Sequence, residues 1–308
     1  MFSEPLADLR RHRMRVLVLF LVLGGAATGA LAPMTQATFP GPNGRITFGS
    51  ARTSSFEIFS TKSSGNGVRR LTHNSKDDFS PSYSPNAQRI AFVDEPSLTN
   101  DEIRIMNANG RHNHALTHTP TAFEEAPSFG PRGKIAFDSD RRGGTSQIFV
   151  MDADGKHQHA LTRASNPSFE AGYSPTGRMI AFTRNVNGNL EVFVMRSDGT
   201  HLRNLTKNGA GDSEPQFSPD GKKILFESNR SGNTDLFVMH ADGSHVRNLT
   251  HNPGVDVTGS YSPNGTRIAF ESVRGGNDDI FVMTATGSHQ HRITKSPSLD
   301  TDPDWGVG

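Results

Sequence analysis

The sequence predicts an all-β fold, a six-bladed β-propeller of four-stranded antiparallel blades. One phrase recurs six times between Phe39 and Trp305, and its clearest copy begins at Glu214 and reads Glu-Pro-Gln-Phe-Ser-Pro-Asp-Gly-Lys-Lys-Ile-Leu-Phe-Glu-Ser-Asn-Arg. The prolines of its turn lie 43 to 46 residues apart, at Pro42, Pro85, Pro131, Pro175, Pro219 and Pro263. A period of this length accommodates four short strands with their turns, which is one propeller blade.

Two apolar runs in each repeat predict buried strands. The first has the form Ile-x-Phe, as at 90–92, and the second, in repeats three to six, has a form close to Ile-Phe-Val-Met, as at 148–151. Apolar residues at consecutive positions are typical of strands that are covered on both faces. The second run is followed by pairs that tolerate the positive φ of a tight turn, namely Asn109-Gly110, Asp154-Gly155, Asp198-Gly199, Asp242-Gly243 and Thr286-Gly287.

The two ends of the repeat region predict how the ring closes. The first repeat lacks an innermost strand of its own, because Phe39 leads directly into the turn at Pro42. Asp302-Pro-Asp-Trp305 supplies such a strand after the last repeat. We therefore expect the C-terminal strand to join the first blade, which leaves no open sheet edge, within a single propeller spanning residues 38–308.

Residues 1–37 predict a secretory signal peptide. A basic region at 10–15 precedes an apolar run at 16–32, and Thr35-Gln-Ala37 is a plausible cleavage site. The apolar run could instead remain in the bilayer as a short membrane anchor. The chain has no cysteine, which excludes disulfides and a lipidated cysteine. We expect an exported protein that is periplasmic, secreted or associated with the cell envelope.

The charge balance argues against a nucleic-acid partner. The chain has 32 Lys and Arg against 31 Asp and Glu, and loss of residues 1–37 would leave 28 against 29. A nearly neutral protein offers no general electrostatic footprint for nucleic acid. Contact with a membrane is expected only through an uncleaved N-terminal segment.

The repeat resembles the propeller of the TolB family, a WD40-like repeat with a Pro-Asp turn. The family repeat has the form Asp-x-x-Pro-x-Trp-Ser-Pro-Asp-Gly, Ile-Ala-Phe-x-Ser-x-Arg and Ile-Tyr-Val-Met-x-x-Asp-Gly. This chain matches it, in most repeats with phenylalanine or tyrosine in place of tryptophan, as at 212–221, and with Ile-Phe-Val-Met, as at 148–151, and the resemblance covers about 267 residues. It implies the fold more than the function, because similar repeats serve in periplasmic scaffolds, in the gating propellers of prolyl oligopeptidases and in polysaccharide lyases. Complete TolB has an α/β domain ahead of its propeller, and we expect the propeller alone here.

Acidic residues recur at one position of the predicted innermost strands, five residues before the aromatic side chain. The predicted channel-mouth ring consists of Asp78, Glu124, Asp212, Asp256 and Asp300. Four residues after the second-strand phenylalanine, four blades carry an arginine, namely Arg52, Arg141, Arg230 and Arg274. Blade four has Ser168 and Val186 and so lacks both partners. This matched absence favours structural ion pairs over a ligand-binding ring. Glu170 and Glu214, displaced by two residues along their strands, are also expected to face the channel, and no ligand role is assigned to them.

Blade two departs from that rule, because Pro96 occupies the place of the arginine that would neutralise Asp78. Asp94 and Glu95 add negative charge close by in the sequence. Hard cations favour clustered oxygen ligands, so Asp78, Asp94 and Glu95 are predicted to bind calcium or a cationic segment of a partner. The alternative is a solvated acidic loop.

These observations favour an exported protein-interaction or scaffolding module of the cell envelope. We expect a monomer with no required cofactor that binds an envelope protein or peptide at the channel mouth and its loops, where a propeller gathers variable segments on a rigid support. The alternative is a metal-dependent enzyme of the lyase or lactonase type, with its site in the central channel. An enzyme would need converging acids or histidines, and the histidines are predicted to lie on the outer rim, so no catalytic residue is assigned.

Overall fold

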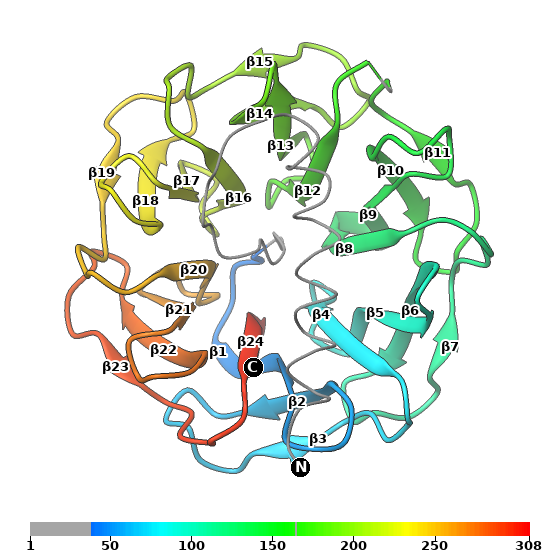
Figure 1. The fold of residues 1–308 in the computed structure, drawn as a ribbon, viewed down its shortest axis with the longest axis vertical. Helices are drawn as coiled ribbons and strands as arrows, with labels where there is room; N and C mark the ends of the chain where they lie inside the picture. Colours follow the sequence, from blue (N-terminus) through cyan, green and yellow to red (C-terminus); the bar gives the residue numbers. More distant parts are fainter. Residues whose placement is uncertain (1–37, 164) are drawn as a thin grey trace.

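The computed structural model describes residues 38–163 and 165–308, and it confirms the predicted six-bladed propeller (Figure 1). Six four-stranded antiparallel sheets surround one axis, and the only helix among the described residues is the short 3-10 turn η1 (Pro131–Gly133). No helix in this part of the chain is long and apolar enough to span a bilayer. The predicted signal segment lies outside the described residues.

Each blade has its innermost strand beside the axis and a two-residue strand at the rim. From the axis outward, blade one has β24 (Asp300–Val307), β1 (Asn43–Ser50), β2 (Glu57–Thr61) and β3 (Arg69–Arg70), and blade two has β4 (Asp77–Tyr83), β5 (Arg89–Ser97), β6 (Asn100–Asn107) and β7 (His114–Ala115). Blade three has β8 (Glu124–Gly130), β9 (Lys134–Ser139), β10 (Gln147–Asp152) and β11 (His159–Ala160), and blade four has β12 (Ser168–Tyr173), β13 (Met179–Val186), β14 (Asn189–Arg196) and β15 (Arg203–Asn204). Blade five has β16 (Asp212–Phe217), β17 (Lys223–Ser228), β18 (Asp235–His240) and β19 (Arg247–Asn248), and blade six has β20 (Asp256–Tyr261), β21 (Arg267–Ser272), β22 (Asp279–Thr284) and β23 (His291–Arg292).

The C-terminal strand closes the ring as predicted. β24 pairs antiparallel with β1, with Trp305 opposite Ile46 and Asp300 opposite Ser50. In Figure 1 the red β24 lies beside the blue β1 near the axis. Trp305 is only 2% exposed and packs in one core cluster with Ile46 and Phe48. The last residues of the chain are therefore part of the core of the first blade.

Pairs of phenylalanines form the centre of five blades. In each pair, one ring from the second strand lies opposite one ring from the third, as Phe226 lies opposite Phe237, and the ring centroids are 5.7 to 6.0 Å apart. Tilted or offset pairs at this distance are favourable arrangements of aromatic rings. Blade two has no such pair, because Arg104 occupies the third-strand position opposite Phe92.

Turn glycines bring each blade against the preceding one. Gly110 has a φ of 84°, and a Cβ atom there would lie 2.3 Å from the carbonyl oxygen of Leu71 in the preceding blade. Gly287 is in the same situation against Leu249, at 2.5 Å. Glycine at these turns therefore supplies both the left-handed backbone and the close approach between blades.

The antiparallel order gives the propeller two distinct faces. The tight turns between first and second strands, and between third and fourth strands, lie on one face, which we call the turn face. The connections between second and third strands, and those from blade to blade, lie on the other, which we call the loop face. Because innermost strands begin at the loop face, the residues of the channel-mouth ring lie there.

Candidate functional site

Four carboxylates of the channel-mouth ring pair with the four arginines that the sequence singled out. Arg52 contacts Asp300 at 2.6 Å and Arg230 contacts Asp212 at 2.7 Å, while Arg141 pairs with Glu124 and Arg274 with Asp256. All four acids have fully buried side chains, whereas the arginines are 16 to 27% exposed. Burial outweighs the arginine and raises the pKa of Glu124 and of Asp256.

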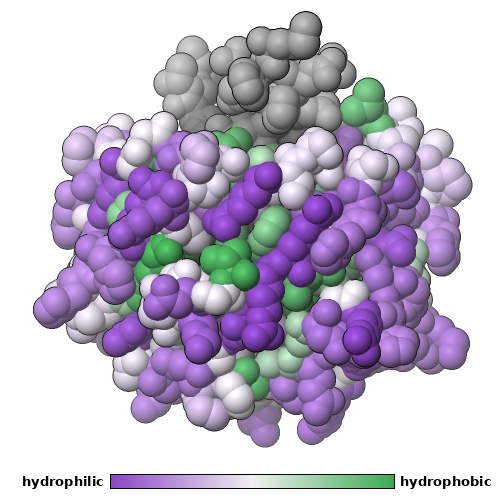
Figure 2. All heavy atoms as spheres, turned by 90° about the horizontal axis from the view of Figure 1, so that it is seen from below, coloured by the Kyte–Doolittle hydropathy of each residue, from purple (hydrophilic) through white to green (hydrophobic). Residues whose placement is uncertain are grey.

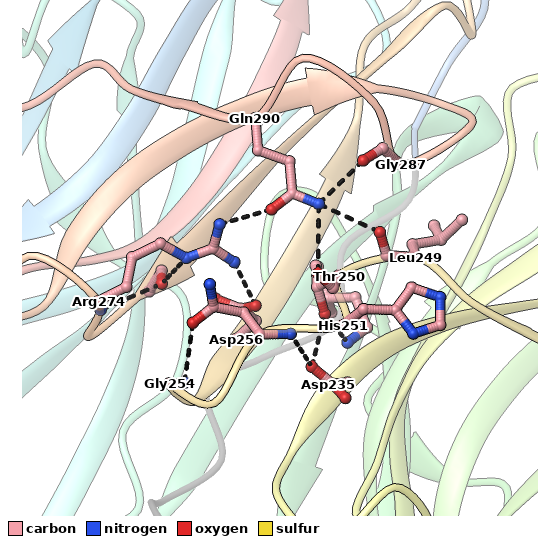
Figure 3. Close-up of polar contacts among 12 residues, drawn as sticks. Asp235, Leu249, Thr250, His251, Gly254, Asp256, Arg274, Gly287 and Gln290 are labelled. Atoms are coloured by element: carbon pink, nitrogen blue, oxygen red, sulfur yellow. Dashed lines mark hydrogen bonds and ion pairs between the residues drawn. The ribbon is translucent and has the colours of Figure 1, made fainter.

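Figure 3 shows how the pair in blade six is held. Arg274 donates to Asp256, to Ser272 Oγ at 3.0 Å and to Gln290 Oε1. The Gln290 amide in turn donates to the carbonyl oxygens of Gly287, at 2.9 Å, and of Leu249 in the preceding blade, at 3.2 Å. The ion pair therefore belongs to a network that joins two blades, which is a structural role.

Each of these arginines also covers the phenylalanine pair of its own blade. The guanidinium carbon of Arg230 lies 5.4 Å from the ring centroid of Phe226 and 5.1 Å from that of Phe237, and the arginines of blades one, three and six repeat the arrangement. A guanidinium within about 6 Å of a ring face is attracted by the ring quadrupole. These arginines are thus fixed both by an acid and by two aromatic rings.

Blade four corrects the sequence analysis, which assigned it neither partner. Arg184 lies over Phe182 at 5.6 Å and over Phe193 at 5.4 Å, and its Nε donates to Ser168 Oγ at 3.2 Å. In the sequence, Arg184 stands two positions before Val186, where the arginine of this blade was expected. The strand β13 continues to Val186, so in blade four the arginine belongs to the strand itself. Blade four therefore keeps the arginine and lacks only the acid.

In blade two, strand register brings together two of the three residues predicted to bind calcium. Asp78 and Asp94 are partners across β4 and β5, whereas Glu95 is opposite Asp77 and its side chain lies on the other face of the sheet. Burial, followed by the charges of Asp94 and Glu57, raises the pKa of Asp78 to about 8. No group of three or more acidic or histidine side chains among the described residues is arranged to hold a metal ion.

Calcium binding at blade two therefore remains a prediction. Asp78 is fully buried; its Oδ2 accepts a 2.6 Å hydrogen bond from Asn74, and its Oδ1 has no hydrogen-bond partner among the described residues. If calcium binds there, titration calorimetry should show saturable heat that disappears in the Asp78→Asn, Asp94→Asn variant. An absence of heat with the unchanged chain would contradict the prediction.

A further group of acids lies around the axis, and we call Asp138, Glu170, Glu214 and Glu227 the axial acids. They come from blades three, four and five and are only 4 to 8% exposed. None of the four forms an ion pair with a lysine or arginine of the described residues. Of these four, the sequence predicted a position facing the channel for Glu170 and Glu214, and no ligand role was assigned to any of them.

The position of two axial acids follows from a bulge in every innermost strand. The strand register shifts at the same place in all six blades, and the residue in the bulge has a φ of 52 to 58° although it is never glycine. The bulge residues are Ser80, Ala126, Glu170, Glu214, Thr258 and Asp302. A bulge redirects the side chain of its residue, and here it places Glu170 and Glu214 beside the axis.

Most axial acids have a structural hydrogen bond as well. The backbone N–H of Glu170 donates to Asp138 Oδ1 at 2.8 Å, and that of Thr258 donates to Glu227 Oε1 at 2.7 Å. Both bonds join neighbouring blades at the bulge. Glu214 differs, because neither of its carboxylate oxygens has a hydrogen-bond donor among the described residues.

Protonation of the axial acids is favoured by their surroundings. Burial raises the pKa of Glu170 to about 7 and that of Glu227 to about 8. Burial, followed by the charges of Glu227, Glu170 and Asp302, raises the pKa of Glu214 well above its usual range. An ionised carboxylate that lacks a cation in such a place is costly, and a cation brought close to it would recover part of that cost.

The histidines do not join these acids. Five exposed histidines stand in the turns just before the fourth strands, on the turn face. They are His112, His157, His201, His245 and His289. Among the described residues, no group of three or more histidine and acidic side chains is arranged to hold the metal ion that the lyase alternative needs.

Comparisons with known proteins place the chain in a family. No curated protein matches the sequence. The fold is similar to that of TolB from Acinetobacter baumannii, with 21% sequence identity and a TM-score of 0.75 over 86% of this chain and 67% of that one. It is also similar to that of a putative TolB from Agrobacterium tumefaciens, with 19% identity and a TM-score of 0.69 over 85% of this chain and 90% of that one. A third similar structure is oligogalacturonate lyase from Vibrio parahaemolyticus, with 10% identity and a TM-score of 0.59 over 86% of this chain and 78% of that one. The family model described as TolB beta propeller domain matches residues 27–171 and 164–260. The chain therefore belongs to the TolB β-propeller domain family.

Proposed function

We propose that the chain is an exported protein-interaction module of the cell envelope, which binds a basic segment of a partner protein on the loop face around the axis. The observation that carries this proposal is the contrast between two sets of acids. Four ring carboxylates each have their own arginine, whereas the axial acids have no cation among the described residues. A lysine or arginine side chain from a partner would supply the missing positive charge.

The electrostatics support a partner of this charge. Interactions between charges are several times stronger in a partly buried site than in bulk water, so a lysine or arginine that reaches the axial acids would lower their pKa and hold them in the ionised form. The loop face also carries the blade-to-blade connections, which are free to vary without disturbing the sheets. Membership of the TolB family and the apolar N-terminal run of the sequence support export.

Site-specific photo-crosslinking in intact cells tests the proposal. A crosslinking residue at exposed His73, on the loop face, should capture a discrete envelope protein, whereas one at exposed Leu202, on the turn face, should not. The Glu170→Gln, Glu214→Gln variant should lose most of the His73 product, because glutamine cannot ionise when a cation of the partner approaches. Equal products from both faces, or an undiminished product in the double variant, would contradict the proposed surface. Recovery of the protein in the cytoplasmic fraction would contradict export.

A further inference from the structure

A pocket of about 650 Å³ lies between blades one and two on the turn face, opposite to the loop face. Its charged and amide lining consists of Arg45, Arg69, Arg70, Gln88, Arg89, Asn107 and Asn109. These residues lie at the turn-face ends of β1, β5 and β6, and on the short edge strand β3. Figure 2 views the molecule from the side where β2 and β3 lie in Figure 1, and strongly hydrophilic side chains lie there among smaller apolar groups.

Positive charge in this pocket exceeds the negative charge that could balance it. Only Arg70 has an acidic partner, Glu57, at 2.6 Å. Arg45, Arg69 and Arg89 form no ion pair with any described residue. Arg45 and Arg69 both line the pocket, and burial, followed by the positive charge of Arg69, lowers the pKa of Arg45.

Neutral acceptors hold Arg45 in place. Its Nε donates to Ser60 Oγ at 3.1 Å, and its Nη2 donates to the carbonyl oxygens of Ser60 and Gly67, at 3.0 and 2.5 Å. These bonds fix the direction of the guanidinium and leave its charge unbalanced. A group that is already oriented loses little conformational entropy when a ligand binds.

Comparison with blade three shows that blade two lacks the carboxylates that would balance these arginines. In blade three Lys134 lies opposite Asp152 in the strand register, and the two side chains form an ion pair. The same register in blade two places Arg89 opposite Asn107, an amide that cannot neutralise it. The following turn carries Asn109 where blade three has Asp154. Amides thus replace carboxylates at both positions, and the arginines remain available to an external anion.

We propose that this pocket binds a phosphate group, carried by a free phosphorylated compound or by a lipid headgroup. The planar guanidinium group makes paired hydrogen bonds to the oxygens of such an anion, and the amides of Gln88, Asn107 and Asn109 can donate further bonds. Three arginines without acidic partners suit a ligand with at least two negative charges. The volume of the pocket lies within the range of small-molecule sites.

Titration of the full chain with inorganic pyrophosphate tests the proposal. We expect saturable binding that weakens as salt is added, and a loss of about tenfold or more in affinity for Arg89→Gln, which corresponds to about 1.4 kcal/mol. Asn107→Asp should weaken binding similarly without removing any arginine, because it gives Arg89 the partner that Lys134 has in blade three. The matched control is Arg267→Gln, which removes an exposed arginine from the equivalent position of blade six and should leave affinity unchanged.

Vesicle flotation distinguishes the two sources of phosphate. If the ligand is a lipid headgroup, the chain should float with phosphatidylcholine vesicles that contain cardiolipin, whose headgroup has two phosphates, more than with phosphatidylcholine vesicles alone, and Asn107→Asp should reduce the difference. Pyrophosphate binding without this difference would assign the pocket to a soluble phosphate compound. Absence of saturable pyrophosphate binding, or binding that neither Arg89→Gln nor Asn107→Asp weakens, would overturn the proposal.

Discussion

A chain that ends at Leu299 should fail to fold cooperatively. The deletion removes β24, the innermost strand of blade one, and with it Trp305, whose side chain is 2% exposed. Loss of a buried aromatic side chain alone costs about 3 to 5 kcal/mol of stability. The deletion also exposes the inner edge of β1 and removes the contacts of β24 with β4 and β20. Because whole domains are stable by only about 5 to 15 kcal/mol, we expect the unfolding transition in circular dichroism to disappear.

A rearranged chain provides the control for that deletion. Gly308 N–H donates to the carbonyl oxygen of Pro42 at 2.9 Å, so the end of β24 lies beside the start of β1. Residues 300–308 placed directly ahead of Pro42 should therefore form the hairpin that every other blade has, and they should restore a cooperative transition. A truncated chain that unfolds like the intact one would show that β24 contributes little to closing the ring.

The fold could be predicted from the sequence because the repeat states each feature several times. The apolar runs, the turn glycines and the missing first strand all agree, so a weak signal in one blade is supported by five others. The ion pairs of the channel-mouth ring could be predicted for the same reason, because the acid and the arginine each stand at a constant distance in sequence from the aromatic residues of their blade. Arg184 was missed because β13 is longer than its counterparts and brings its arginine from an unexpected position.

The bulge that positions two of the axial acids, and the arginine pocket, could not be predicted in the same way. Glu170 and Glu214 reach the axis through a bulge whose left-handed residue is not glycine, and such a bulge has no sequence marker. The arginines of the pocket come from two different repeats, and each one taken alone looks like an ordinary edge residue. Their meeting depends on how one blade packs against the next, which a comparison of equivalent positions does not reveal.

Blades four and five together allow a direct measurement of what a ring ion pair contributes. Arg230 binds both oxygens of the fully buried Asp212, at 2.7 and 2.9 Å, and also lies over its phenylalanine pair. Arg184 makes the same ring contacts in blade four but has only Ser168 in place of the acid. The two arginines therefore differ mainly in whether their removal leaves a buried charge behind.

Arg230→Leu should destabilise the propeller by about 3 to 5 kcal/mol, because breaking a buried pair by removing one partner leaves Asp212 uncompensated. Arg184→Leu should cost only about 1 kcal/mol, the value of the lost ring contacts and one neutral hydrogen bond. Asp212→Ser copies blade four into blade five, and in that background Arg230→Leu should cost no more than Arg184→Leu does. Urea unfolding of the four variants measures these differences. Equal costs for the two arginines in the unchanged background would mean that packing on phenylalanine, rather than neutralisation of the ring acid, explains why the arginines are there.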